Sequence, residues 1–444
     1  MGELLNLIDQ RQFIQVRQII QNENVVDLAE FIGEIDDDPR ALIIFRLLPK
    51  EMAAEVFAYL DHDIQQTMVE GITDKELAGI VDELFLDDTV DFIEEMPASI
   101  VKRVIKAADP DTRRQINQLL MYPDSSAGSI MTIEFMEVDR DWNIRNAIEK
   151  IRRQAEDKEA IDTLFVTDEQ RRLEGVIGLR DILTGHDDAL IGELMKTDVM
   201  SAKTHDDQAM VAEMFKKYDL LTMPVVDNEN RLVGLITIDD VIDVIEAETT
   251  EDIELMAAIT PSDKPYLKTG AVELWKRRIP WLLILMISAT FTGIIITRFE
   301  SALATCVALT AFIPMLMDTG GNSGSQSSVT VIRGISLGEL GFSDLPCIIW
   351  KEFRVAMMCG LTLAVCNFVK LMLIDRVSVL VAGVVCFTLV FTVLVAKIVG
   401  CILPMVAEKI GFDPAVMASP FITTIVDAIS LIIYFQMATL LLGL

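Results

Sequence analysis

The amino-acid sequence predicts a multidomain membrane protein in which soluble segments precede an α-helical membrane domain. Three observations lead to this fold class: two internal repeats of different period, an excess of acids before Ala271, and long apolar runs after it. The predicted parts are an N-terminal all-α superhelical domain (1–128), a duplicated α/β unit (129–248), an acidic connecting helix (249–274) and a five-helix transmembrane domain (275–444).

Charge is divided unevenly between these parts. From Ala271 onwards the sequence holds 10 acidic and 11 basic residues, whereas the part before Ala271 holds 58 acidic and 27 basic residues, a net charge of −31. A surface this acidic repels phosphate backbones and attracts cations, so we expect no nucleic-acid partner. Solubility alone is the other explanation of this charge. No basic, apolar signal segment opens the chain, so the soluble part is expected in the cytoplasm.

Residues 1–128 are predicted to be helical, because apolar residues recur at helical spacing and Gly and Pro are few. Leu48-Pro49 recurs as Met96-Pro97, and Asp61-His62-Asp63 recurs at the same interval as Asp109-Pro110-Asp111. Such a period is typical of stacked helical pairs. We expect each proline near a helix start and each Asp-x-Asp at the cap of the next helix.

Residues 129–248 contain a strand–turn–strand–helix pattern that occurs twice at a constant interval. The short β-branched runs predict strands, and an Asp-x-x-x-x-Leu segment predicts the turn between them. The last aspartate of each copy is expected to begin a helix. The matching residues are Asp168, Leu173, Gly175 and Asp181 in the first copy, and Asp227, Leu232, Gly234 and Asp240 in the second.

A single helix is expected from Asp239 to Glu254. Carboxylates at 3–4 spacing form one stripe of it, and they repel one another unless they are solvated or neutralised by cations. Carboxylate oxygens are hard ligands that suit Mg²⁺ or Ca²⁺. The stripe is formed by Asp240, Asp243, Ala247, Glu251 and Glu254, and the expected packing face by Val241, Ile242, Val244 and Ile245.

Five apolar runs are each about long enough to cross a membrane. Basic residues immediately before the first run place its start in the cytoplasm, and the basic residues of later loops agree with this orientation. We therefore expect a multi-pass protein of the cell (plasma or inner) membrane, with a cytoplasmic N-terminus and an external C-terminus. The runs are residues 279–297, 302–317, 353–374, 377–403 and 415–442.

Two features of these runs suggest an ion pathway. The second run passes Pro314 and enters Gly320-Gly321-Asn322-Ser323-Gly324-Ser325-Gln326, which we expect to end a helix and to line a water-filled cavity. Asp427 follows Pro414 and lies roughly 20 Å into the last run. A charge at that depth costs at least ~2.5 kcal/mol, so it is a functional candidate. The alternative is a protonated or helix-paired Asp427, with Lys397 the basic residue well inside another run.

The duplicated α/β unit resembles a tandem of CBS domains. Such pairs commonly bind adenine nucleotides in the cleft between the copies, so the resemblance implies ATP as a ligand. The alternative is a CBS pair that only packs and dimerises. The positions that match the ribose- and phosphate-contacting pattern are Arg180, Asp181, Thr237 and Asp240.

The whole chain resembles the MgtE family of magnesium channels. The resemblance is carried by the glycine-rich segment after Pro314, by Asp413-Pro414-Ala415, by Thr423-Thr424-Ile425-Val426-Asp427 and by the order of the four parts. It implies a homodimer with a pore between the subunits, in which hydrated Mg²⁺ lies at the late aspartate. The implied pore residues are Asp427, Thr423, Asn322, Gly320 and Gly321.

The resemblance also implies regulation, because the family closes its pore when cytosolic Mg²⁺ binds acids of the soluble parts. The expected function is a Mg²⁺-selective channel for Mg²⁺ uptake, with Mg²⁺ as both substrate and regulator. The alternative is a proton- or cation-coupled secondary transporter of divalent cations. No enzyme is expected, since no nucleophile–base constellation is visible. The matching acids are Glu55, Asp87, Asp91, Asp219, Asp240, Asp243, Glu248, Glu251 and Asp252.

Overall fold

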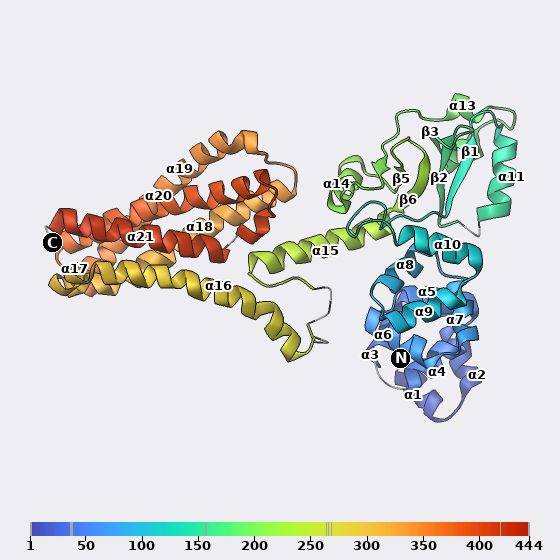
Figure 1. The fold of residues 1–444 in the computed structure, drawn as a ribbon, viewed down its shortest axis with the longest axis horizontal. Coiled ribbons are helices and arrows are strands. Elements are labelled where there is room, and N and C mark those ends of the chain that lie inside the picture. The colour runs from blue at the N-terminus through green and yellow to red at the C-terminus, as the bar shows by residue number, and fades with distance from the viewer. Residues whose placement is uncertain are drawn as a thin grey trace. The chain divides into compact units, whose positions relative to one another are not determined.

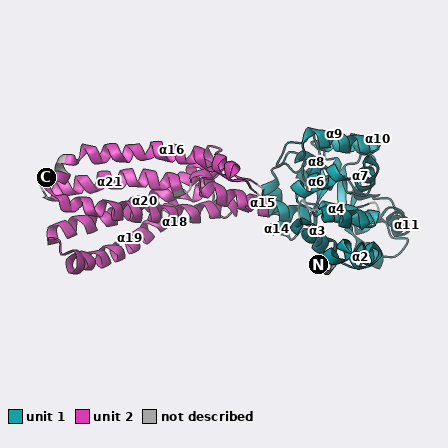
Figure 2. Cartoon of the chain, turned by 90° about the horizontal axis from the view of Figure 1, so that it is seen from below, with its two compact units in different colours: residues 1–245 teal, residues 246–444 magenta. Residues whose placement is uncertain are grey.

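The chain forms two compact units, residues 1–245 and residues 246–444 (Figure 2). The structure is a computed structural model, and it describes residues 2–35, 39–155, 158–262, 264, 266–267, 269–417 and 419–442. The first unit holds a helical domain and two small sheets, and the second holds long helices (Figure 1).

The N-terminal domain is all-α, as predicted. Pro49 and Pro97 both occupy N-cap positions, at α5 and α9. Asp109 Oδ1 accepts hydrogen bonds from the backbone nitrogens of Asp111 and Thr112 at the start of α10, whereas Asp61 makes no such bond at α6. The helices are α1 (Gly2–Asp9), α2 (Phe13–Ile20), α3 (Val25–Glu34), α4 (Pro39–Leu47), α5 (Lys50–Ala58), α6 (His62–Gly71), α7 (Asp74–Val81), α8 (Leu86–Glu94), α9 (Ala98–Ala107) and α10 (Pro110–Leu119).

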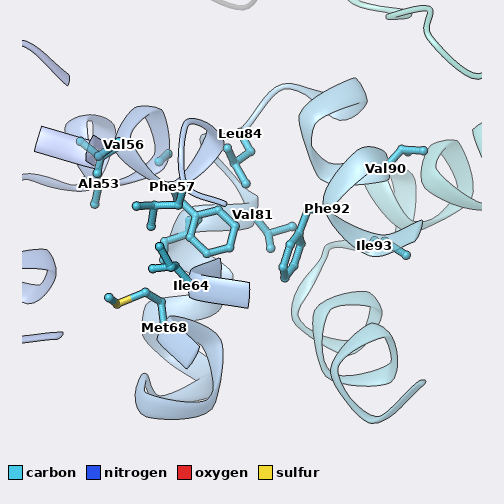
Figure 3. Close-up of a cluster of buried hydrophobic side chains, with 14 of the residues drawn as sticks. Ala53, Val56, Phe57, Ile64, Met68, Val81, Leu84, Val90, Phe92 and Ile93 are labelled. Carbon is cyan, nitrogen blue, oxygen red and sulfur yellow. The ribbon is translucent and has the colours of Figure 1, made fainter. Parts of the chain in front are cut away.

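An apolar core joins these helices. Phe57 of α5 and Phe92 of α8 meet edge to face, with ring centroids 5.0 Å apart, and Ile64 and Val81 lie beside them (Figure 3). This core contributes to fixing the position of α8, because Val90, Phe92 and Ile93 of that helix are all buried in it. Burial of such side chains stabilises the fold by about 1.5–3 kcal/mol each.

Two three-stranded sheets follow, with the orders β1-β2-β3 and β4-β5-β6. In each sheet the first pair of strands is parallel and the second is antiparallel. The sequence predicted the last two strands of each copy. The elements are β1 (Phe135–Asp139), α11 (Ile144–Gln154), β2 (Ala160–Thr167), β3 (Leu173–Gly178), α12 (Leu179–Thr184), α13 (Ile191–Leu194), β4 (Ala202–Lys203), α14 (Gln208–Tyr218), β5 (Thr222–Val226) and β6 (Leu232–Thr237).

The predicted turns have the same hydrogen bonds in both copies. Asp168 Oδ1 accepts from the backbone nitrogens of Gln170 and Arg172, and Asp227 Oδ1 accepts from those of the equivalent residues, Glu229 and Arg231. A short aspartate side chain that binds its own backbone favours such a turn. The duplication is therefore confirmed in three dimensions.

The helix predicted from Asp239 to Glu254 is α15 (Ile238–Met256), which ends well before residue 274, the predicted end of the connecting segment. Its packing face is narrower than expected. Val241 and Val244 are buried, whereas Ile242 and Ile245 are 55% and 41% exposed. The expectation for these two isoleucines was wrong. Residues at positions i and i+3 share a helix face, so Val241 and Val244 form the buried face, and Ile242 and Ile245 form the neighbouring, exposed face.

Among its described residues the second unit has five long helices, of which α18 packs against α20 and α21, and α19 packs against α20. In the part of the chain that the structure describes, four stretches could cross a membrane by length and composition: Ala271–Arg298, Phe342–Asp375, Val379–Lys409 and Pro414–Leu441. The number of five spans therefore stays a prediction. The elements are α16 (Ala271–Arg298), α17 (Glu300–Thr305), η2 (Val307–Phe312), α18 (Ile313–Ser336), η3 (Phe342–Asp344), α19 (Leu345–Lys370), η4 (Leu371–Asp375), α20 (Val379–Lys409), η5 (Pro414–Met417) and α21 (Ser419–Leu442).

The second apolar run does not form a helix that ends at a glycine-rich loop, so this prediction was wrong. The structure divides the run into α17, η2 and the start of α18, and α18 continues through the glycine-rich segment to Ser336. A Cβ at Gly324 would lie 2.7 Å from Ile422 Cγ2 of α21. The small residues thus allow α18 to approach its neighbours closely, as small residues commonly do between membrane helices.

The last helix begins later than its apolar run. A 3₁₀ turn, η5, precedes α21, and Pro420 lies in the first turn of α21, where its missing N–H costs nothing. Because the helix starts only at Ser419, Asp427 lies about 12 Å rather than about 20 Å along it.

Candidate cation sites

Three carboxylates of the first unit converge on one point. Asp87 in the first turn of α8, Glu159 just before β2 and Asp240 in the first turn of α15 each offer an oxygen, and these oxygens lie within 4.8 Å of one another. Glu134 contributes to this placement. Its Oε2 accepts a hydrogen bond from the backbone nitrogen of Leu86 (3.0 Å), and its carbonyl oxygen accepts one from the backbone nitrogen of Glu159 (3.2 Å).

The cluster combines one buried acid with two partly buried ones, and it is poor in hydrogen-bond donors. Asp87 is 6% exposed, and both Asp87 Oδ1 and Glu159 Oε2 are buried without a hydrogen-bond partner among the described residues. Asp240 Oδ2 accepts a hydrogen bond from the Thr237 hydroxyl at 2.6 Å. Unsatisfied buried carboxylate oxygens are costly, so this arrangement favours either protons or a cation at the cluster.

The electrostatics of the cluster agree with this conclusion. Burial, followed by the nearby charge of Asp87, raises the pKa of Asp240 to about 8 and that of Glu159 to about 9. Burial also raises the pKa of Asp87. A group of hard oxygens with a surplus of negative charge is the kind of site that Mg²⁺ or Ca²⁺ occupies. Chemically, the cluster can exchange bound protons for a divalent cation.

The other predicted regulatory acids lie outside this group of three. Asp91 and Asp243 follow Asp87 and Asp240 by about one helical turn, and both are exposed. Glu55 is exposed on α5, and Asp219 is exposed at the C-cap of α14 with a φ of 51°. The remaining acids belong to the second unit, on the later part of α15, where Asp252 Oδ2 accepts a hydrogen bond from Ser336 Oγ (3.1 Å). These are Glu248, Glu251 and Asp252.

The four candidate nucleotide residues fall into two pairs. Thr237 and Asp240 bind each other, and Asp240 belongs to the acid cluster just described. Arg180 and Asp181 are exposed in the first turn of α12. Asp240 was predicted for both roles, and in the structure it forms with Asp87 and Glu159 a group of acids that could hold a metal ion.

In the second unit the candidate pore residues are placed by α18 and α21. Gly320 and Gly321 are buried, and a Cβ at Gly321 would lie 2.9 Å from Thr423 Cγ2. The Thr423 hydroxyl donates to the carbonyl oxygen of Pro420 (2.9 Å). Asn322 is exposed and Asp427 is half-buried.

An exposed polar stripe runs along α18. Asp318, Asn322, Gln326 and Thr330 recur at every fourth position and are all exposed in the single chain. Asp318 also acts electrostatically on Asp427 of α21. A polar face of a membrane helix avoids lipid and faces protein or water. The stripe and Asp427 can therefore line a hydrated path.

The sequence did not point to two of the carboxylates described above, Asp318 and Glu159. Asp318 could have been found, because it precedes Asn322 by one helical turn once the glycine-rich segment is taken as helix. Glu159 carries no such signal. It lies in a connection before β2, and only the pairing of β1 with β2 brings it beside Glu134 and the start of α8.

Comparison with known proteins identifies the chain's relatives. Family profiles match residues 313–437 (MgtE, divalent cation transporter), 23–125 (MgtE intracellular N domain), and 127–186 and 191–247 (CBS domain). The chain is 35% identical to the magnesium transporter MgtE of Thermus thermophilus over 435 residues, which cover 96% of this chain and 95% of that protein. This chain belongs to the MgtE family of magnesium transporters.

Other relatives agree with this assignment. The magnesium transporter MgtE of Bacillus subtilis is 32% identical, over 95% of this chain and 93% of that protein. The cytosolic domain of the Mg²⁺ channel MgtE in complex with ATP has a TM-score of 0.52 and 33% identity, and the match covers 54% of this chain and 98% of that domain. The family's members are membrane transporters with Mg²⁺ as substrate, not enzymes. The predicted resemblance to the MgtE family and the prediction of a transporter rather than an enzyme are therefore confirmed.

Proposed function

We propose that this MgtE protein is a homodimeric, Mg²⁺-selective channel for Mg²⁺ uptake that closes when cytosolic Mg²⁺ binds its soluble acids. The proposal places the protein in the plasma or inner membrane with a cytoplasmic N-terminus and an external C-terminus. The observation that carries the regulatory part is the cluster of Asp87, Glu159 and Asp240, whose oxygens lie within 4.8 Å of one another.

The transport path of this proposal runs along α18 and α21. Asp427, with Thr423, Asn322, Gly320 and Gly321, supplies the pore, and the exposed stripe that begins at Asp318 supports it. A second copy that covers this stripe keeps it from lipid, which is why we propose a dimer. One carboxylate cannot dehydrate Mg²⁺, which holds its waters tightly, whereas two Asp427 side chains can hold one hydrated ion.

Closure follows from charge. The part of the chain before Ala271 carries a net charge of −31, and its segments repel one another in a compact arrangement. A cation that binds the compact state more tightly than the extended one shifts the population by its differential affinity. Mg²⁺ at the acid cluster and at the other regulatory acids has this effect in our proposal.

The CBS pair is proposed to bind an adenine nucleotide, in support of which stands the ATP complex of the related cytosolic domain. Arg180, Asp181 and Thr237 are the proposed contacts, with Asp240 shared between nucleotide and cation. Titration of the full-length protein with ATP in Mg²⁺-free and Mg²⁺-containing buffer tests this part, and the absence of binding in both buffers contradicts it.

Patch-clamp recording of the reconstituted full-length protein tests the main proposal. Stepping Mg²⁺ on the cytoplasmic face should shut a current that is present at low Mg²⁺. Asp427→Asn should abolish the current with the protein still folded, whereas Glu339→Gln, an exposed acid between α18 and η3, should leave it unchanged. Flux that never exceeds transporter rates and requires a proton gradient would instead establish the coupled-transporter alternative.

A further inference from the structure

A buried polar chain links three helices of the second unit. Ser327 of α18 donates its hydroxyl to Glu352 Oε2 of α19 (2.6 Å), and Lys397 Nζ of α20 donates to Ser327 Oγ (3.3 Å). The Lys397 ammonium lies 3.9 Å from the same Glu352 oxygen. The Lys397 and Glu352 side chains are 5% and 15% exposed. Lys397, the candidate counter-charge for Asp427, thus pairs with Glu352 instead.

Burial of the Glu352 and Lys397 charges inside the membrane domain costs free energy. Either ion alone inside a membrane helix costs at least about 2.5 kcal/mol, and removing one partner of a buried pair leaves the other uncompensated. A pair of apolar side chains of similar volume is often as stable as a buried ion pair. The pair is therefore poorly explained by stability, and a role in positioning explains it better.

The position of the pair indicates what it holds. Ser327 lies one helical turn after Gly324, and Lys397 lies one turn before Gly400, and these two glycines are where the backbones of α18 and α20 touch. A different face of α18 carries the exposed stripe of Asn322 and Gln326, whereas Ser327 is buried. The polar chain thus holds α18 by one face, and another face of the same helix carries the proposed path.

We propose that Glu352 and Lys397 are positioning residues for Mg²⁺ transport, which act on α18 through Ser327. The pair holds α18 in place against α19 and α20 and leaves no uncompensated charge behind the path. This inference rests on the proposed path along α18. Because a positive Lys397 without its partner repels a divalent cation, the charge balance matters for transport as well as for packing.

Mg²⁺ uptake into proteoliposomes that contain the full-length protein tests the pair. Glu352→Gln and Lys397→Met should each lower uptake by about tenfold, and the double variant should recover most of the loss, because adjacent groups couple strongly. A pair that only supports the fold would show this rescue in stability alone, so uptake is compared per amount of folded protein, which thermal unfolding in detergent measures. A double variant as inactive as Glu352→Gln would overturn the proposal, because Glu352 would then act by itself on the ion.

Two neighbouring serines keep the test decisive if the charge variants fail to fold. Ser327→Ala removes the bridging hydroxyl and keeps both charges, whereas Ser328→Ala removes a buried hydroxyl that has no hydrogen-bond partner among the described residues. We expect uptake to fall severalfold for Ser327→Ala and to stay unchanged for Ser328→Ala. Equal uptake by these two variants would overturn the proposal. Uptake is measured for a channel and a coupled transporter alike, so failure here is distinct from failure of the channel proposal, which the wild-type current decides.

Discussion

Gly400 of α20 lies directly against the backbone of Gly324 in α18, so that a Cβ at Gly400 would overlap the carbonyl oxygen of Gly324. Backbone cannot yield as a flexible side chain does, and this contact therefore sets how closely the two helices approach. The membrane domain depends on the absence of side chains at this crossing, as membrane helix interfaces often do.

Gly400→Ala should destabilise the membrane domain by about 1–3 kcal/mol, because it overpacks a tight interface. Gly383→Ala on the same helix is the matched control, since a Cβ there meets nothing within 4 Å. That control should be neutral or slightly stabilising, because alanine favours helix by about 1 kcal/mol over glycine. Thermal unfolding of the purified protein in detergent measures both, and equal midpoints would contradict the assigned contact.

Asp109→Ala should destabilise the start of α10 by about 1 kcal/mol, because this carboxylate caps two backbone nitrogens. Asp61→Ala, at the equivalent place one repeat earlier, should cost less, since Asp61 makes no side-chain capping bond. Hydrogen exchange of the amides of α10 and α6 measures the two effects. A larger loss of protection for Asp61→Ala than for Asp109→Ala would contradict the capping bonds that the structure assigns to the two repeats.

Glu159→Gln should raise the Mg²⁺ concentration for half-inhibition of transport by about tenfold, because a carboxylate ligand is lost. The same variant should stabilise the Mg²⁺-free protein above about pH 9, where Glu159 would otherwise be charged beside Asp87 and Asp240. Glu169→Gln, an exposed acid in the turn after β2, should change neither quantity. An unchanged midpoint for Glu159→Gln would exclude Glu159 from the regulatory site.

The stability of the Mg²⁺-free acid cluster should fall as pH rises. The pKa values of Asp240 and Glu159 are raised from 3.8 and 4.5 to about 8 and about 9, so the folded state binds more protons than the unfolded chain between those limits. The free energy of unfolding then decreases with pH across that window, from about pH 4 to about pH 9.

Mg²⁺ competes with these protons, so the added stability from Mg²⁺ should be larger at pH 8.5 than at pH 6. Hydrogen exchange of α8 in the full-length protein, converted to opening free energies, measures this difference with and without Mg²⁺. Equal stabilisation by Mg²⁺ at both pH values would mean that the cation does not displace protons from this cluster.

Asp318→Asn should lower the Mg²⁺ current severalfold, most strongly at low ionic strength, because the variant removes a charge that attracts cations to the path beside Asp427. Recordings at two salt concentrations measure the effect. If the current is unaffected at low salt, the exposed stripe of α18 does not face the ion.

The sequence by itself determined the order of the parts, both repeats and the acidic helix. These features depend on local chemistry: Asp168 and Asp227 bind their own turns, Pro49 and Pro97 start helices, and α15 carries its acids at helical spacing. The family and its substrate could also be predicted, because the glycine-rich segment and the late aspartate are contiguous patterns.

Only the tertiary structure decided which residues meet. The proline and the glycine-rich composition predicted a loop, whereas in the structure this segment is a helix that packs tightly against Thr423 and Ile422. Glu159 joins Asp87 and Asp240 from a distant part of the chain, through strand pairing that no local pattern records. The same holds for Lys397, whose partner is Glu352 rather than Asp427. The physical reason is that buried charges are stabilised by neighbours in space, and packing alone determines those neighbours.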